Sequence, residues 1–428
     1  MTLKRSWLAT ALLNFVLVAL LGLLLRWQFV DPISGLNFKF FLHAHSHVAL
    51  LGWLYLAILV VLLYAYLPAQ LSGKKMYAWL FWLAQAAVLG MLLSFPVQGY
   101  ALFSITFSTL HILFSYGFIF VFLKDARRSE LVQWQHKFSF KFIKAALFFM
   151  ALSSLGPWAM GPIMATGNSF TPVYYNAIYF YLHFQYNGWF TFAILGLFFW
   201  LLEHYQVTFN LQKATLFFRL MFWAALPAYL LSVLWTQPHF SVYLIAGIAA
   251  FAQLFGLVIL VNILHPVWPQ LREKFSNWSI ALLGFSALAF VLKIVMQAAT
   301  AFPYMADLAY KIRHLIIGYL HLVLIGFISL FLLAFFIQQS WLSLKSWLSG
   351  FGLTAFLTAF VLSEGLLFLQ GLMFWMRAGA LPHYDQLLFA ISVFLPLGLI
   401  LFSIPQIEFS NSNEFPAEQF SSDFQKKS

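Results

Sequence analysis

The chain contains no cysteine among its 428 residues. It therefore has no disulfides, no cysteine-held iron–sulfur cluster, no thiolate ligand for haem and no covalently attached c-type haem. A haem or metal ion in this protein has to be held by other side chains. The twelve histidines are the natural donors, because neutral imidazole binds haem iron, copper and zinc.

Charge is also scarce. Only 8% of the residues are charged, whereas soluble domains carry about 25%, and 63% are hydrophobic. This composition predicts an all-α polytopic membrane protein, because helices satisfy their own backbone groups in lipid. With about 20 apolar residues per span, about twelve transmembrane helices are expected in one bundle. The expected spans are 7–26, 41–66, 77–96, 100–123, 142–164, 173–202, 214–236, 240–264, 278–300, 312–338, 345–374 and 386–405.

The domain organisation follows from the same pattern. Residues 1–406 are expected to form a single integral membrane domain. The polar residues 407–428 are expected to form a cytoplasmic tail without fixed structure. Inspection indicates no internal repeat and no separate soluble domain.

The net charge of +11 is unevenly distributed along the chain. If the N-terminus is cytoplasmic and the spans alternate, most lysines and arginines fall on the cytoplasmic side, above all in the loop 124–144. The basic residues left on the outer side are Arg26, Lys39, Lys311, Arg313 and Arg377. This asymmetry obeys the positive-inside rule and places both termini in the cytoplasm. It explains the net charge without nucleic acid, and the expected location is a bacterial inner membrane.

Most histidines fall in the outer half of the expected bundle. They are His43, His45 and His47 in span two, His183 in span six, His239 at the end of span seven, and His314 and His321 in span ten. Ionisable side chains within a bilayer are costly and mark functional sites. Histidines from distant parts of the chain thus predict a haem or metal site in one half of the membrane.

Helical spacing divides these histidines. His43 and His47 are four residues apart and share a helix face, while His45 points nearly the opposite way. His47, His183 and His321 lie at similar depths, and we expect them to face a common cavity. The shallower histidines, His45 among them, are candidates to bind a second metal ion or to hold haem propionates.

Three further polar residues lie within the spans. Tyr186, close to His183, is a candidate proton or electron donor; alternatively it belongs to a group of polar side chains that join helices. Lys293 and Glu364 are the two charged residues well inside spans. They either pair with each other or belong to a proton or ion path.

Twelve spans with both termini inside, and outer-half histidines on spans two, six, seven and ten, resemble the catalytic subunit of the haem-copper oxidase superfamily. That family includes cytochrome c and quinol oxidases and the large subunit of nitric oxide reductase. The resemblance implies electron transfer or chemistry on O2 or NO. It also implies the lipid bilayer, an electron-donor protein or quinol, and further membrane subunits as partners.

The resemblance also implies cofactors. Haem b is expected with His43 or His47 as its ligand on span two and His321 or His314 as its ligand on span ten. Copper is the second implied cofactor, with His183 and His239 as its ligands.

Two other functions stay open. The first is a twelve-span secondary transporter, for which the glycine- and proline-rich segment 156–162 is a suitable helix break. The second is a non-haem metal enzyme that uses the His-x-His-x-His segment of span two.

Overall fold

The computed structural model describes residues 5–127 and 137–410, and within these ranges it contains helices and no strand. Eleven helical runs are long and apolar enough to cross a membrane. The expected span 173–202 is also one continuous helical run, Pro172–His204, but it is not among the eleven. Its polar residues, such as Gln185 and Asn187, lower its hydropathy. The protein is therefore an all-helical integral membrane protein, as its composition predicts.

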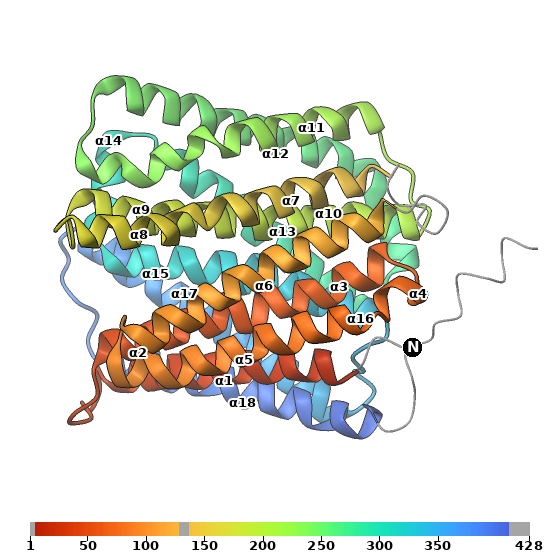
Figure 1. The fold of residues 1–428 in the computed structure, drawn as a ribbon, viewed down its shortest axis with the longest axis horizontal. Coiled ribbons are helices and arrows are strands. Elements are labelled where there is room, and N and C mark those ends of the chain that lie inside the picture. The colour runs from red at the N-terminus through yellow and green to blue at the C-terminus, as the bar shows by residue number, and fades with distance from the viewer. Residues whose placement is uncertain (1–4, 128–136, 411–428) are drawn as a thin grey trace, which may run out of the picture. The chain divides into compact units, whose positions relative to one another are not determined.

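In chain order the helices form three similar groups. Figure 1 labels them and colours the chain from red at the N-terminus to blue at the C-terminus. The first group holds α1 (Arg5–Trp27), α2 (Phe38–His47), η1 (Val48–Tyr55), α3 (Leu56–Tyr66), α4 (Ala69–Ser72), α5 (Lys75–Gln98) and α6 (Leu102–Ala126). The second holds α7 (Ser139–Ser153), α8 (Leu155–Ala165), α9 (Pro172–His183), η3 (Phe184–Phe190), α10 (Thr191–His204), α11 (Leu211–Ala225), η4 (Pro227–Thr236) and α12 (Phe240–Lys274). The third holds α13 (Asn277–Ala299), α14 (Pro303–Lys311), α15 (Arg313–His321), η5 (Leu322–Ser329), α16 (Leu330–Gln338), α17 (Trp347–Trp375) and α18 (Tyr384–Ser410).

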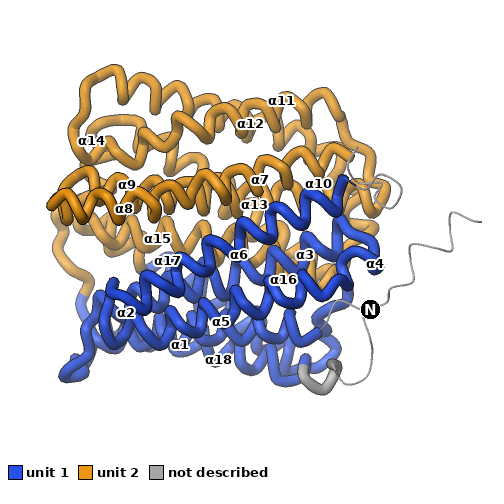
Figure 2. The backbone as a smooth tube through the Cα atoms, in the orientation of Figure 1, with its two compact units in different colours: residues 1–135, 339–366, 382–428 blue, residues 136–338, 367–381 orange. Residues whose placement is uncertain are grey.

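Packing divides the chain into two compact units (Figure 2). Unit 1 contains residues 1–135, 339–366 and 382–428, and unit 2 contains residues 136–338 and 367–381. The expected single domain 1–406 therefore contributes to both units. Helix α18 continues to Ser410, so the expected tail begins within a helix. The rest of that tail, and residues 128–136 of the expected basic loop, lie outside the described residues.

The same helix contacts recur in each group. The first helix packs against the η segment of its own group, as α1 does with η1, α7 with η3 and α13 with η5. Helices α5 and α6 pair closely, and so do α11 and α12. In the third group α17 and α18 approach closely at Gly352, where an added Cβ would lie 2.7 Å from the Gly398 carbonyl oxygen.

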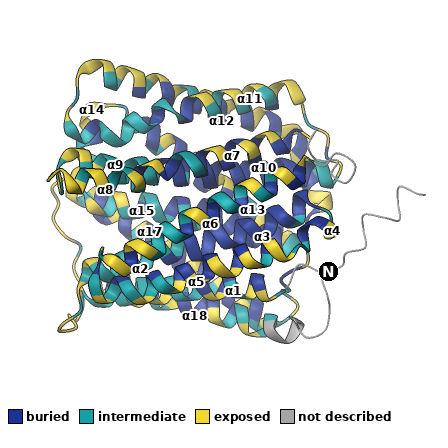
Figure 3. Ribbon diagram, viewed as in Figure 1, coloured by how far each residue is buried: buried dark blue, intermediate teal, exposed yellow. Residues whose placement is uncertain are grey.

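The helix that follows each of these η segments is the most buried of its group. Helices α3, α10 and α16 appear almost entirely in the buried colour in Figure 3. Each of them is apolar on nearly all sides, which is typical of a helix surrounded by other helices. The segments η1, η3 and η5 therefore each lead directly into the most buried helix of their group.

Candidate functional site

Three histidines stand directly before π-helical segments. His47 precedes η1, His183 precedes η3 and His321 precedes η5. These are the π-helices found in the described part of the chain. π-Helical turns are rare and are frequent at functional sites. His47, His183 and His321, which are expected at similar depths, thus share a local backbone geometry that their spacing alone does not predict.

The sequence around these histidines repeats. Each histidine is followed five residues later by glycine and then by an aromatic residue. The three sets are His47, Gly52 and Trp53; His183, Gly188 and Trp189; and His321, Gly326 and Phe327. Five residues is also the hydrogen-bonding interval of a π-helix. The expectation that the chain has no internal repeat is therefore wrong, and the three motifs are visible in the sequence at nearly equal intervals.

Polar side chains from the first helix of each group hold the π segments. Asn14 of α1 donates to the Gly52 carbonyl at 3.0 Å. Ser286 of α13 donates to the Phe327 carbonyl at 2.7 Å. In the second group the donor lies on the π segment, where Gln185 donates to Ser153 of α7 at 2.9 Å. These bonds fix each π segment against a neighbouring helix in a low-dielectric interior.

The π segments η3 and η5 each accept an equivalent side-chain hydrogen bond. Thr191 donates its hydroxyl to the Tyr186 carbonyl at 2.6 Å, and Ser329 donates to the Leu324 carbonyl at 2.7 Å. Both hydroxyl residues follow their histidine by eight residues, and both carbonyls follow it by three. The second and third motifs are therefore alike in side-chain bonding as well as in sequence.

His47 has the ring geometry of a ligand. Its Nδ1 lies 2.8 Å from the His43 carbonyl oxygen, so the tautomer that donates from Nδ1 leaves the lone pair on Nε2. A backbone carbonyl at Nδ1 is a common way to orient a ligating histidine. Nε2 lies 3.5 Å from the Tyr100 hydroxyl. The rings of His43 and His47 both pack against Phe95 and Tyr100, on the shared face that their spacing predicts.

His45 faces helix α1 instead. Its Nδ1 lies 3.0 Å from the Val18 carbonyl oxygen. Gly22 provides room for the ring, since a Cβ at that position would lie 3.2 Å from His45 Cε1. In this arrangement His45 joins α2 to α1.

His183 is buried, and both of its ring nitrogens have protein partners. Nε2 lies 2.9 Å from the Ala225 carbonyl oxygen, and Nδ1 lies 3.1 Å from the Asn187 side-chain amide. In a continuous α-helix the Ala225 carbonyl would accept a hydrogen bond from the Tyr229 N–H. Here α11 is followed by the 3₁₀ segment η4, and the Tyr229 N–H donates to the Leu226 carbonyl instead. The Ala225 carbonyl can therefore accept from His183. His183 binds a metal ion only if one of these bonds is released.

His239 and His314, the other candidate ligands, each make separate local contacts. His239 is exposed and caps the N-terminus of α12, where its Nδ1 accepts from the Ser241 N–H at 3.3 Å. His314 packs edge-on against Phe374 at 5.2 Å between ring centroids. Within the described residues no three histidine, aspartate or glutamate side chains group as a metal site. The copper ligands that the resemblance implies, His183 and His239, are engaged in the contacts described above, and the copper site stays a prediction.

The two charges within spans lie in different units. Lys293 of α13 is buried, and its Nζ donates to Gln297 Oε1 at 3.4 Å. The Nε2 of the same Gln297 amide donates to Gln253 Oε1 of α12 at 3.0 Å. Glu364 of α17 is buried within electrostatic reach of Arg26 at the end of α1. Pairing between Lys293 and Glu364 and a proton or ion path both stay predictions.

Tyr186 lies beside a second tyrosine. Its ring packs edge-on against that of Tyr319, with 6.1 Å between the centroids. Tyr319 lies two residues before His321, and the segments η3 and η5 are in contact. The motifs of His183 and His321 are thus neighbours within unit 2.

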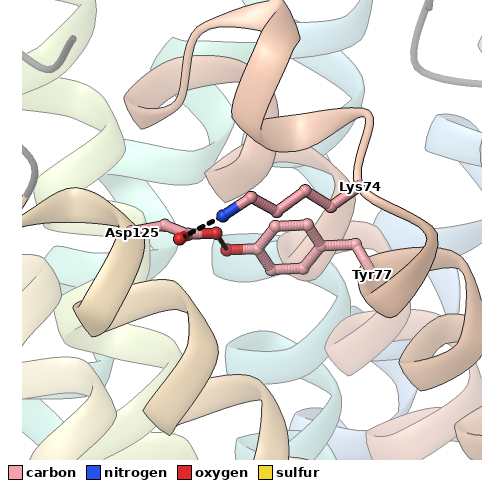
Figure 4. A network of polar contacts seen from close by, with 3 residues as sticks. All are labelled: Lys74, Tyr77 and Asp125. Atoms are coloured by element: carbon pink, nitrogen blue, oxygen red, sulfur yellow. Dashed lines mark hydrogen bonds and ion pairs between the residues drawn. The ribbon is translucent and has the colours of Figure 1, made fainter.

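One polar network was not anticipated from the sequence. Asp125, buried at the end of α6, pairs with Lys74 and accepts a hydrogen bond of 2.9 Å from the Tyr77 hydroxyl (Figure 4). The charge distribution in the sequence predicts only that Lys74 lies on the cytoplasmic side, with no acidic partner. The signal available in the sequence is an acidic residue, Asp125, between Lys124 and Arg127.

No protein-family model matches the sequence, and comparison with curated proteins gives no significant match.

Proposed function

We propose that the chain is a membrane haem protein that resembles the catalytic subunits of respiratory oxidases and nitric oxide reductases. The observation that carries this proposal is the placement of three histidines at the entrances of three π segments. A helix that is apolar along its length has no packing need for an imidazole, and polar groups within spans usually serve function. Three such histidines in one repeated motif favour a cofactor over chance.

Haem b is the cofactor that the residues fit best. His47 would hold it through Nε2, while the His43 carbonyl orients the ring through Nδ1. His321 has the corresponding place in unit 2, and we propose that it is also a haem ligand. When bound, haem supplies an iron that changes oxidation state and carries electrons or binds O2 or NO. The role of the protein is to orient the imidazoles and to exclude water from them.

The haem proposal is tested by spectroscopy of the purified protein. Reduced-minus-oxidised spectra should show a haem signal, which His47→Ala and His321→Ala should each diminish or remove. His265→Ala is the matched control, because His265 is an exposed histidine of α12 and belongs to no π motif. A colourless protein that holds copper or zinc would instead favour the non-haem metal enzyme.

A secondary transporter is the second candidate. Internal repeats and buried intramembrane charges are typical of transporters, and this chain has a repeated motif and the buried Lys293. Purified protein that carries neither haem nor metal would favour this function. The histidines would then be structural or would bind the substrate.

We further propose twelve spans with both termini in the cytoplasm of a bacterial cell. Three groups of four spans support this number, with Pro172–His204 as the second span of its group. An even number of spans per group would let each π-segment histidine enter the membrane from the same side. That side is the outer one by the distribution of lysine and arginine.

A further inference from the structure

Helices α7 and α11 are neighbours in unit 2 and run in the same direction. Phe142 of α7 packs edge-on against Phe218 of α11, with 4.9 Å between the ring centroids. Further along both helices Phe149 meets Phe222 at 5.4 Å. The residue numbers rise on both helices from the first contact to the second, so the start of α7 lies beside the start of α11.

Basic side chains from both helices meet near these starts. Lys144 lies two residues after Phe142, and Arg219 lies one residue after Phe218. Since a helix rises 1.5 Å per residue, both lie within about 3 Å of the level of that ring contact. Both are exposed, as is Lys141, which is three residues before Lys144 and shares its face. Two neighbouring helices thus present positive charge at one level.

This positive charge is not matched by acidic side chains. Among the described residues, neither Lys144 nor Arg219 forms an ion pair with a carboxylate. The first turns of α7 and α11 contain no acidic residue. Glu203 of α10 reaches the start of α7, but its carboxylate accepts from the Phe138 and Ser139 N–H groups and from the Ser139 hydroxyl. Because the positive ends of two parallel helix dipoles add to the basic side chains, this region attracts an anion.

An exposed apolar surface begins one turn further along each helix. Phe148 follows Lys144 by four residues and is 47% exposed, and Trp223 follows Arg219 by four residues and is 66% exposed. Residues four apart share a helix face, so each ring lies next to its basic residue along the span. Phe148 also meets Phe222 of α11 at 6.1 Å between the ring centroids, which places the two exposed rings beside one seam.

The lysine side chains point away from the apolar surface. The Nζ of Lys144 lies 5.7 Å from the centre of the Phe140 ring, and the Nζ of Lys141 lies 5.5 Å from that of Phe138. Both rings precede their lysine in the chain, so the ammonium groups are directed toward the start of α7. Side chains that snorkel in this way place their charge at the level of lipid headgroups.

We propose that the seam between α7 and α11 binds an anionic phospholipid. Its phosphate is held between Lys144 and Arg219, whose guanidinium group can donate two N–H groups to one phosphate. An acyl chain packs along Phe148 and Trp223, which a free phosphate ion would leave uncovered. In the topology proposed above this end of α7 is cytoplasmic, and the cytoplasmic leaflet carries anionic lipids. The site needs no haem and goes beyond the proposed function.

The absence of cysteine allows one fluorophore to be attached beside the seam. Leu216→Cys is suitable, because Leu216 is 44% exposed and lies three residues before Arg219 on α11. The labelled protein is placed in phosphatidylcholine bilayers with a small fraction of nitroxide-labelled phosphatidylglycerol or of phosphatidylcholine with the same labelled chain. The relative binding constant from quenching should favour phosphatidylglycerol about tenfold, because each basic side chain favours an anionic headgroup several-fold.

The reference position is Ile248 of α12, which is 63% exposed and away from the seam. With the fluorophore at Ile248→Cys, the two labelled lipids should quench equally. This comparison separates a preference of the seam from a general attraction of phosphatidylglycerol to a basic protein.

Lys144→Gln combined with Arg219→Gln is the decisive variant, and it should bring the preference at Leu216→Cys close to one. Lys75→Gln combined with Lys345→Gln is its matched control, because it removes two exposed positive charges from unit 1 and should leave the preference unchanged. Inorganic phosphate in place of chloride at equal ionic strength should also leave it unchanged. Size-exclusion profiles establish that the variants are folded.

Three results overturn the lipid site. They are equal quenching by the two lipids at Leu216→Cys, a preference that survives in the variant without Lys144 and Arg219, and a preference that inorganic phosphate abolishes. The last result would assign the basic pair to free phosphate. No haem signal enters these measurements, so failure of the lipid site and failure of the proposed function are distinguishable.

Discussion

His47 and His183 open π segments of the same kind, yet their ring nitrogens have different surroundings. In His47 a carbonyl of its own helix engages Nδ1, and Nε2 meets only the Tyr100 hydroxyl at 3.5 Å. In His183 a carbonyl from a different helix engages Nε2 and an amide engages Nδ1. The same motif therefore presents an available imidazole in unit 1 and a fully bonded one in unit 2. At this scale His47 is the stronger ligand candidate.

Asp125 allows a test of how much one buried ion pair stabilises unit 1. Asp125→Asn removes the charge that pairs with Lys74 and weakens the acceptor of the Tyr77 hydroxyl. We expect a loss of about 1–3 kcal/mol in the free energy of unfolding, because the hydrogen-bonded partners stay behind without it. Thermal unfolding in detergent micelles measures the change.

The control for Asp125 is an ion pair that is exposed. Lys311 and Asp307 lie four residues apart on α14, and both side chains are well exposed. Asp307→Asn should change the stability by less than about 1 kcal/mol, because solvent screens exposed pairs. Equal losses in the two variants would contradict a special role for the Asp125 network.

At the scale of elements, the glycines of the first two motifs, Gly52 and Gly188, set how closely a neighbouring helix approaches. A Cβ at Gly188 would lie 2.6 Å from Phe149 Cβ of α7, and a Cβ at Gly52 would lie 2.9 Å from a Val88 methyl of α5. Both distances are shorter than ordinary contact. Segments η1 and η3 thus combine a histidine directly before their start with a close helix contact five residues later.

Gly188→Ala should therefore destabilise the protein. The added methyl group has to displace η3 or α7, and overpacking of this kind costs about 1–3 kcal/mol. The measurement is again the unfolding temperature in detergent, and the bond from Gln185 to Ser153 should weaken along with the helix contact.

Gly284→Ala in helix α13 is the control for this prediction. Apart from the backbone of α13 itself and the two adjoining residues, no heavy atom of the protein lies within 4 Å of a Cβ at that position. Alanine favours a helix over glycine by up to about 1 kcal/mol, so this variant should be neutral or more stable. If Gly188→Ala is also neutral, the helices at η3 are not as closely fitted as their distances indicate.

At the scale of the whole molecule, three groups of helices are built on one plan. Each has a first helix that packs on its π segment and, after that segment, a helix buried on nearly all sides. It follows that a membrane topology assigned to one group should hold for the other two.

Reporter fusions test this topology. Fusions after Lys144 and after Pro303 should report opposite sides of the membrane, with Lys144 cytoplasmic, because lysine and arginine concentrate on that side. A fusion within 166–170, between α8 and α9, should report the same side as the fusion after Pro303. Fusions at Lys144 and Pro303 that report one side would refute the twelve-span model.

The sequence by itself determined the class of this protein and the location of its helices. Scarce charge and long apolar runs leave a chain no stable state except helices in lipid. The sequence also contained the repeated motif of His47, His183 and His321, which is readable as histidine, glycine and an aromatic residue at fixed spacing. Such local patterns depend on residues near in sequence, which is why they can be recognised without a structure.

Only the tertiary structure decided which groups the side chains meet. Helix spacing gives the face on which His45 or His183 lies, but not that Val18 or Ala225 offers a carbonyl there. Those partners come from residues far along the chain, and their positions depend on how α1 and α11 pack. The same reason applies to the bond between Asn14 and Gly52, and to the ring contact between Tyr186 and Tyr319. Contacts of this kind are properties of the packed helices, because no single segment contains both partners.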